Sequence, residues 1–142
     1  MFILPRTVEI VIQPQYADTD MMGVVYHANY LKYFELGRTA FIEAAGYSYV
    51  QMEEKGFYAP VYDARVTYKS PLRYGDKATL STWLSNNDGI KTTYAYELTN
   101  ENGARCVTGC TTHIIVKKDS FKPVAFKKAF PDWFHLYEEW KM

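Results

Sequence analysis

The sequence lacks an excess of charge of either sign, because its 142 residues hold 16 Lys plus Arg against 16 Asp plus Glu. It also has no run of basic residues, and non-specific nucleic-acid binding needs clustered positive charge. Long hydrophobic runs are missing too. No stretch approaches the roughly 20 apolar residues of a membrane-spanning helix, and Met1–Arg6 is apolar for only three residues after the Met, too short for a signal peptide. We therefore expect a cytoplasmic protein with no nucleic-acid partner and no membrane span.

Cysteine is scarce, with only Cys106 and Cys110 in the chain. On a strand their Cα atoms would lie roughly 13 Å apart, which is beyond the reach of a disulfide. Without a second pair of ligands or a suitably spaced His, the two thiols make a poor zinc site. We predict two free thiols and no metal site.

Hydrophobic and aromatic residues are abundant, at 48% and 17% of the chain, with 13 Tyr and 8 Phe. This is enough to build a core. Tyr suits half-wet surfaces such as an interface or a substrate channel, where the ring packs and the hydroxyl finds a partner, but Tyr also favours ordinary strands. The length fits one compact domain, so we predict a single domain over residues 1–142.

Residues 30–45 have the period of a helix. Apolar and small residues recur at steps of three and four, and charged residues occupy the opposite face. Asn29 can cap the start of this helix, and Gly46 can supply the left-handed residue at its end. Gly37 inside the helix is unfavourable by itself, which suggests that another backbone approaches closely there. Ser48-Tyr49-Val50-Gln51 resembles a capping box and predicts a second, shorter helix.

The rest of the chain alternates with period two. This pattern predicts a first strand from Val8 to about Gln13 and, after Phe57, strands near residues 62–69, 77–85, 91–99 and 104–117, with a short helix after Pro131. Turns rich in Asn, Asp and Gly join the later strands. The order predicts an α+β domain in which one long helix lies against an antiparallel sheet. An aromatic edge strand invites pairing with a second copy, so we expect a homodimer or tetramer.

The segment from Asp18 to Tyr30 places two carboxylates and a histidine directly before the long helix. A helix N-terminus offers unpaired N–H groups that can stabilise an oxyanion, and a carboxylate beside it can serve as nucleophile or as base for water. Gly23 lets the backbone approach a ligand. An Asp in such a loop is more often an Asx-turn or a cap, so spacing alone leaves both roles open. A calcium loop is not favoured, because the Gly is misplaced and no bidentate Glu follows.

The motif has a family resemblance. The pattern that carries it is Tyr16-x-Asp18-Thr19-Asp20-x-x-Gly23-Val24-Val25-Tyr26-His27-x-x-Tyr30, followed by Tyr33-Phe34-Glu35 and Arg38, and more loosely by Tyr68-Lys69-Ser70-Pro71-Leu72 and Gly75-Asp76. It closely resembles the 4-hydroxybenzoyl-CoA thioesterase family of hotdog-fold proteins, and within it the YbgC-like acyl-CoA thioesterases. The resemblance implies a hotdog fold, in which a curled antiparallel sheet of about five strands wraps around one long central helix. It also implies hydrolysis of an acyl-CoA to free acid and CoA, with no cofactor other than the CoA of the substrate.

The same resemblance assigns roles to residues. Asp20 matches the catalytic carboxylate, as nucleophile or general base, and His27 matches the position that orients or polarises the thioester, with a backbone N–H nearby as oxyanion contact. The residues expected to bind substrate or to pack around it are Tyr16, Gly23, Tyr30 and Glu35. For Glu35, an ion pair with Arg38 is an equal alternative. Asp18 is expected to shape the loop, and Met21-Met22, in place of the usual small residues, can line an acyl pocket.

Two alternatives stay open. The donor can be acyl carrier protein instead of CoA, and the candidates for a basic rim that would receive either are Lys69, Arg73, Lys117 and Lys118. The chain can also be a non-catalytic hotdog protein that binds acyl chains or a partner, although the presence of both Asp20 and His27 weighs against this. Dehydratases that share the fold do not match the motif. Aromatic lining suits a phenyl ring and an alkyl chain alike.

Overall fold

The computed structural model describes residues 6–142. The short apolar N-terminal run, which is expected to be too short for a signal peptide, lies outside the described residues. The elements, in chain order, are β1 (Thr7–Ile12), η1 (Tyr16–Asp18), α1 (Asn29–Ala44), α2 (Tyr49–Glu54), β2 (Phe57–Tyr58), β3 (Val61–Tyr68), β4 (Ala78–Asn87), β5 (Lys91–Asn100), β6 (Arg105–Lys117), β7 (Pro123–Val124), α3 (Phe126–Ala129) and α4 (Pro131–Trp140).

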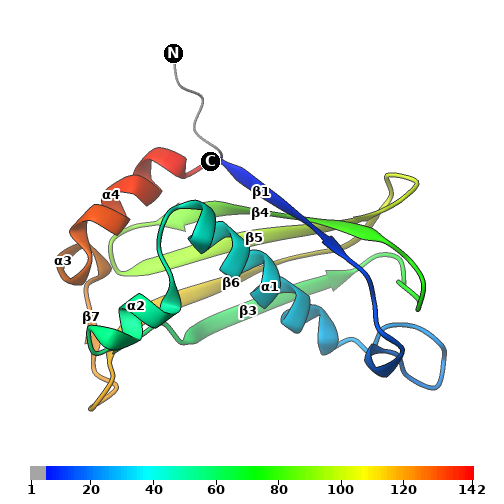
Figure 1. Cartoon of the computed structure of the whole chain (residues 1–142), viewed down its shortest axis with the longest axis horizontal. Helices are drawn as coiled ribbons and strands as arrows, with labels where there is room; N and C mark the ends of the chain where they lie inside the picture. Colours follow the sequence, from blue (N-terminus) through cyan, green and yellow to red (C-terminus); the bar gives the residue numbers. More distant parts are fainter. Residues whose placement is uncertain (1–5) are drawn as a thin grey trace.

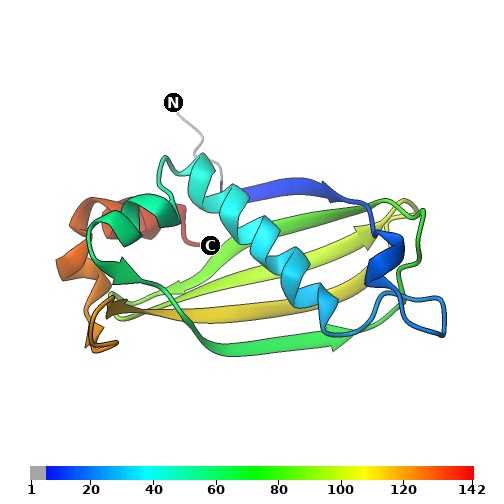
Figure 2. The ribbon, with the colours of Figure 1, turned by 60° about the horizontal axis from the view of Figure 1, so that its bottom comes forward.

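The sheet is antiparallel and α1 crosses one of its faces (Figures 1 and 2). Its long strands run in the order β1-β4-β5-β6, and β3 pairs with the other edge of β6. The two-residue strands β2 and β7 also pair with β6. The predicted sheet of about five strands therefore consists of five long strands and two very short ones, and the α+β class is confirmed. The tight turns predicted after β4 and β5 are present.

The buried face of α1 packs on β1, β4 and β5. Residues at steps of three and four supply this face, as the sequence period predicts. The Phe34 ring stacks on the Tyr96 ring with a centroid separation of 4.3 Å, and Phe41 meets Tyr94 edge to face at 5.8 Å. The helix therefore presses aromatic side chains onto the middle of the sheet, and this packing fixes where its N-terminus lies.

Gly37 is where α1 approaches the sheet most tightly, but the approach differs from the one predicted. A Cβ atom at this position would lie 2.5 Å from the Thr82 hydroxyl oxygen and 2.6 Å from a Leu80 methyl carbon. The expectation of a neighbouring backbone was wrong: the atoms that exclude a side chain here belong to side chains of β4. The missing Cβ lets the helix sit close to the sheet.

At the far end of α1 the predicted left-handed glycine and the predicted start of α2 are confirmed, but of the predicted capping box the structure shows only the bond to the Ser48 side chain. Gly46 adopts a φ of +89° just beyond the helix, and the Ser48 hydroxyl accepts a hydrogen bond of 3.2 Å from the Gln51 backbone N–H at the start of α2. At this same end of the sheet, α3 and α4 add a cluster of buried aromatic residues that consists of Phe126, Phe130, Trp133, Tyr137 and Trp140. Pro131 occupies the first turn of α4, as predicted.

Strand β3 forms an edge of the sheet. Within residues 6–142 its one strand partner is β6, and seven of its eight residues are exposed. The exposed side chains include Val61, Tyr62 and Tyr68. Cys106 is buried and Cys110 is half-buried on β6, both as free thiols. None of the helices in the described residues has the length and apolar character needed to cross a membrane.

Candidate active site

The loop before α1 is folded into a tight turn. Thr19 and Val25 form an isolated antiparallel bridge, the Asp20 N–H donates to the Val24 carbonyl oxygen at 2.9 Å, and the Gly23 N–H donates to the Asp20 carbonyl oxygen at 3.0 Å. Gly23 has a φ of +78°, a left-handed conformation that favours glycine. The motif glycine therefore makes the turn that presents Asp20.

Asp18 anchors this loop to α1. The residue is only 3% exposed. One carboxylate oxygen accepts from the Lys32 ammonium at 2.9 Å, and the other accepts from the Tyr33 hydroxyl at 2.8 Å and from the Gln15 N–H at 3.0 Å. Burial raises the pKa of Asp18, but the hydrogen bonds from Gln15, Lys32 and Tyr33 outweigh burial, so the pKa lies below its ordinary value. The charged carboxylate holds the loop in place.

The backbone of Asp18 also holds the start of α1. Its carbonyl oxygen accepts from the Tyr26 N–H at 2.9 Å and from the Asn29 side-chain amide at 2.8 Å. The prediction that Asn29 caps the helix was wrong. Asn29 is already the first helical residue, Ala28 precedes it in a right-handed helical conformation, and no side chain caps this end. The Asn29 amide is instead used to tie the helix to the loop.

Asp20 is half-exposed at the turn. One of its carboxylate oxygens accepts from the Met22 N–H at 2.8 Å, an Asx-turn contact. Within residues 6–142 the other oxygen makes no hydrogen bond to protein. Asp20 lines a pocket of about 770 Å³ together with the predicted residues Tyr16 and Gly23, and Arg73 lies on the same wall. Asp20 can therefore form the Asx-turn and still act as nucleophile or base, because one carboxylate oxygen accepts the bond from Met22 and the other is free.

His27 lies two residues before the first residue of α1 and is exposed. Within the described chain, the backbone N–H groups of His27 and Ala28 donate to no other protein atom, whereas the Asn29 N–H donates to the Tyr26 carbonyl oxygen at 2.9 Å. Two backbone donors at the positive end of a helix are thus free for a ligand oxygen.

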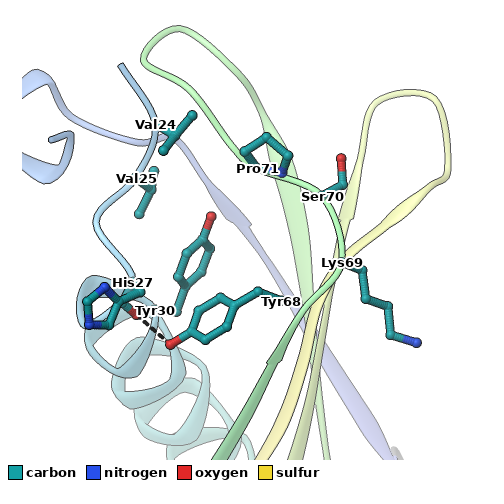
Figure 3. Close-up of a pocket in the computed structure, with 8 residues that line it drawn as sticks. All are labelled: Val24, Val25, His27, Tyr30, Tyr68, Lys69, Ser70 and Pro71. Carbon is teal, nitrogen blue, oxygen red and sulfur yellow. Dashed lines mark hydrogen bonds between the residues drawn. The ribbon is translucent and has the colours of Figure 1, made fainter. Parts of the chain in front are cut away.

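A second pocket, of about 270 Å³, lies between this helix start and the end of β3 (Figure 3). His27 and Tyr30 line it from the helix side, and Tyr68 lines it from β3. The Tyr68 hydroxyl donates to the His27 carbonyl oxygen at 2.9 Å, and the Tyr30 and Tyr68 rings meet edge to face at 5.6 Å. Lys69 lines the rim with its ammonium pointing away from the two rings. The sequence motif did not single out Tyr68 for this contact.

The predicted site residues fall into three groups. Tyr16, Asp20 and Gly23 line the larger pocket, while His27 and Tyr30 line the smaller one next to it. Glu35 lies further along α1, where it lines a third pocket of about 360 Å³. One chain therefore does not bring the three groups into a single cavity.

The alternative for Glu35, an ion pair with Arg38, is not formed within residues 6–142. Arg38 is buried and donates to hydroxyl groups instead: to Tyr49 at 2.8 Å, to Tyr96 at 3.1 Å and to Thr111 at 3.4 Å. The sequence analysis considered Arg38 only as a possible ion-pair partner of Glu35 and did not predict its burial. Arg38 lies four residues after Phe34 and eight after Tyr30, on the buried face of α1. This spacing could have predicted its burial from the sequence.

The basic residues proposed for a rim do not form one patch in the chain. Lys69 and Arg73 line the two pockets at the N-terminal end of α1. Lys117 and Lys118 lie at the other end of the molecule, at the end of β6, where the Lys118 ammonium sits 5.6 Å from the centre of the Tyr58 ring.

Comparison with known proteins agrees with this architecture. The model of a family described as the thioesterase-like superfamily matches residues 14–134. The chain belongs to this family. It is 48% identical over 130 residues to the putative acyl-CoA thioesterase YneP of Bacillus subtilis, covering 92% of this chain and 94% of that protein. It is 29% identical to the acyl-CoA thioesterase YbgC of Haemophilus influenzae, covering 87% and 91%.

A solved structure resembles the chain closely. A DHNA-CoA thioesterase from Staphylococcus aureus superimposes with a TM-score of 0.91 at 39% identity, covering 94% of this chain and 89% of that one. The predicted membership of a hotdog thioesterase family is confirmed, and so is the fold class.

Proposed function

We propose that this chain is an acyl-CoA thioesterase that hydrolyses an acyl thioester to the free acid and CoA. The observation that supports this is that one Asp20 carboxylate oxygen and the backbone N–H groups of His27 and Ala28 have no protein partner in residues 6–142, and that Asp20 and His27 line neighbouring pockets. Hydrolysis of a thioester needs a base or nucleophile on one side of the carbonyl and hydrogen-bond donors on its oxygen. Relatives named as acyl-CoA thioesterases support the same activity.

In the proposed reaction, the thioester carbonyl oxygen accepts hydrogen bonds from the N–H groups at His27 and Ala28. Asp20 acts in one of two ways. As a general base, it takes a proton from water while the water oxygen attacks the carbonyl carbon, and the C–S bond then breaks to release the CoA thiolate, which takes up a proton. As a nucleophile, its carboxylate attacks the same carbon and expels the thiolate, and water then hydrolyses the resulting mixed anhydride.

The donor side of the site supports a CoA thioester, with acyl carrier protein as the alternative. Lys69 and Arg73 lie at the rims of the two pockets and can meet either the phosphates of CoA or an acidic carrier protein. The cytoplasmic location expected from the sequence belongs to the same proposal. Kinetics with one acyl group on CoA and on carrier protein would separate the donors, because the true donor gives the higher kcat/KM.

We also propose that the active form pairs two copies along β3. The support is the exposed edge of β3, which carries Val61, Tyr62 and Tyr68 and has a free row of backbone donors and acceptors. Pairing here would bring a second chain next to the pocket that His27 and Tyr68 line. Mass measurement in solution distinguishes a dimer or tetramer from a monomer.

The decisive test of the reaction is Asp20→Asn. We expect at least about a thousandfold loss of kcat with unchanged folding, because the amide is neither base nor nucleophile. The matched control is Asp88→Asn, because Asp88 also accepts backbone N–H bonds in a turn, at 2.7 and 2.9 Å, but in the turn between β4 and β5. Undiminished turnover by Asp20→Asn would contradict the role of Asp20 as base or nucleophile.

The substrate assay is release of free thiol from short, medium, long and aromatic acyl-CoAs. Turnover of at least one class supports hydrolysis. No turnover across the panel, with binding of acyl-CoA retained, would instead favour the non-catalytic acyl-binding alternative.

A further inference from the structure

Arg38 is a buried cation without a carboxylate partner. It is 8% exposed, and its Nε and one terminal nitrogen donate to the hydroxyls of Tyr49, Tyr96 and Thr111. Within residues 6–142 no Asp or Glu oxygen lies within 4.0 Å of it. The second terminal nitrogen, Nη2, has no protein acceptor in the same residues. The two N–H groups of Nη2 are therefore free to donate to a ligand.

The groups that Arg38 contacts do not neutralise its charge. Burial raises the pKa of Tyr49 and of Tyr96 despite the opposing effect of Arg38, so both hydroxyls stay protonated at neutral pH. His113 contacts Thr111 at 2.9 Å, and burial, together with the charge of Arg38, lowers its pKa to about 4, so it is neutral. The cluster carries one net positive charge, and a buried charge without a counter-ion is costly.

Arg38 also lines the pocket of about 360 Å³ that lies among α1, α2 and the segment leading into β3. Its walls are mostly apolar and are formed by Met52, Phe57, Tyr58, Ala59, Pro60 and Phe121. Two exposed carboxylates, Glu35 and Glu53, also line this pocket. The combination is an apolar cavity with one buried cation and an acidic mouth.

We propose that this pocket binds an apolar group that carries a single oxygen anion, which Nη2 of Arg38 holds. The anion supplies the missing counter-charge, and the walls accommodate the apolar body. The acidic mouth disfavours ligands of higher charge such as phosphate, because Glu35 and Glu53 repel them. The pocket thus selects monoanions with a hydrophobic body.

Two sources supply this chemistry. One is an acyl group with a carboxylate or phenolate on its distal part, and the other is a free organic acid, the class to which the product of the proposed reaction belongs. Arg38 is nine residues beyond Asn29 in α1, which places it roughly 13 Å further along the helix axis. An acyl group that reaches both ends within one chain would have to span about that distance. The choice between these two sources rests on the proposed function. The proposal that the pocket binds an anion does not.

The test compares benzoate with benzamide, which have the same shape and differ in charge, by calorimetric titration of the full-length Asp20→Asn protein. This variant binds without turnover, so the result does not depend on hydrolysis. We expect benzoate to bind about tenfold more tightly than benzamide and inorganic phosphate to bind more weakly than benzoate. Arg38→Met should abolish the preference for benzoate. Arg105→Met, at an exposed arginine of β6 that pairs with Glu97 at 3.8 Å, should retain it.

A second variant keeps Arg38 intact in case its replacement disturbs folding. Ala59→Phe fills the pocket and should remove benzoate binding. Equal binding of benzoate and benzamide, or a benzoate preference that survives Arg38→Met or Ala59→Phe, overturns the proposal.

Inhibition of acyl-CoA hydrolysis by benzoate then identifies the source: competitive inhibition indicates the acyl group, and noncompetitive inhibition indicates a separate site for the free acid. Benzoate binding without any acyl-CoA turnover would reject the proposed reaction and leave this site standing.

Discussion

The Tyr68 hydroxyl, at the end of β3, donates a hydrogen bond of 2.9 Å to the carbonyl oxygen of His27, just before α1. Because the peptide unit is planar and trans, fixing this carbonyl also fixes the N–H of Ala28 in the opposite direction. The edge strand thus orients one of the two free donors at the helix start. In the proposed reaction this donor contacts the thioester oxygen.

Tyr68→Phe should therefore reduce catalysis more than stability. We expect kcat to fall about tenfold, because the oxyanion donor loses its support, and the free energy of unfolding to change by less than about 1 kcal/mol, since the bond is exposed. Tyr62→Phe is the control: Tyr62 is an exposed tyrosine of the same strand whose ring lies under the Lys91 ammonium. Equal kcat values for the two variants would contradict the orienting role of Tyr68.

Gly37→Ala should destabilise the fold even though alanine is the better helix former. Helix propensity favours alanine by about 1 kcal/mol, but overpacking a core costs about 1–3 kcal/mol, and the new Cβ would meet Thr82 and Leu80 at 2.5 and 2.6 Å. Urea unfolding measures the net loss. Glu43→Ala, on the exposed face of α1, should be neutral or stabilising.

The Thr82 hydroxyl is buried without a hydrogen-bond partner in the described chain, so removing it breaks no hydrogen bond. Thr82→Ala should therefore relieve the contact that the new Cβ of Gly37→Ala makes with this hydroxyl. A double-mutant cycle is expected to show that Gly37→Ala costs less in the Thr82→Ala background. Additive effects would place the strain elsewhere.

Much of the fold could be predicted because local signals agree with tertiary packing. The period of residues 30–45 gave α1, the left-handed Gly46 marked its end, and the Ser48 cap marked the start of α2. The strands after Phe57 followed from alternation and turn chemistry. Strands β2 and β7, with two residues each, carry no period that a pattern can reveal.

The site was predicted less completely, because its contacts are long-range. Asn29 has the chemistry of a cap, yet its amide is used by the Asp18 carbonyl eleven residues earlier. The bond from Tyr68 to His27 joins residues 41 positions apart, and no local pattern contains it. Asp18 was rightly expected to shape the loop. The roles of Asp20, His27, Tyr16, Gly23, Tyr30 and Glu35 stay predictions that activity measurements must test.

Asp18→Asn should lower stability by about 2 kcal/mol at pH 7, because it removes a buried carboxylate that accepts three hydrogen bonds. The folded pKa of Asp18 lies below its ordinary value of 3.8, so the unfolded chain binds the proton more readily. The contribution is present above about pH 4 and is lost as pH falls through the folded pKa. The free energies of unfolding of the natural protein and the variant, measured in urea, should therefore converge in acid.

A constant difference between them down to pH 2 would contradict the role of the charge. The control is Asp63→Asn, at an exposed pair with Arg65, which should change the free energy of unfolding little at any pH.

His113 should make the fold lose stability in a higher and separate pH window. Burial and the neighbouring Arg38 lower its pKa from 6.5 to about 4, so below pH 6.5 the unfolded chain takes up a proton that the folded protein refuses. Protonation therefore favours unfolding, and stability should fall as pH drops from about 6.5 to about 4. His113→Gln keeps a polar side chain near the Ala59 carbonyl and Thr111, which His113 contacts at 3.1 and 2.9 Å, and should flatten this slope. His135→Gln, at an exposed histidine of α4, is the matched control. If unfolding in urea at pH 7, 6, 5 and 4.5 gives the same slope for all three proteins, His113 titrates normally and is not held neutral beside Arg38.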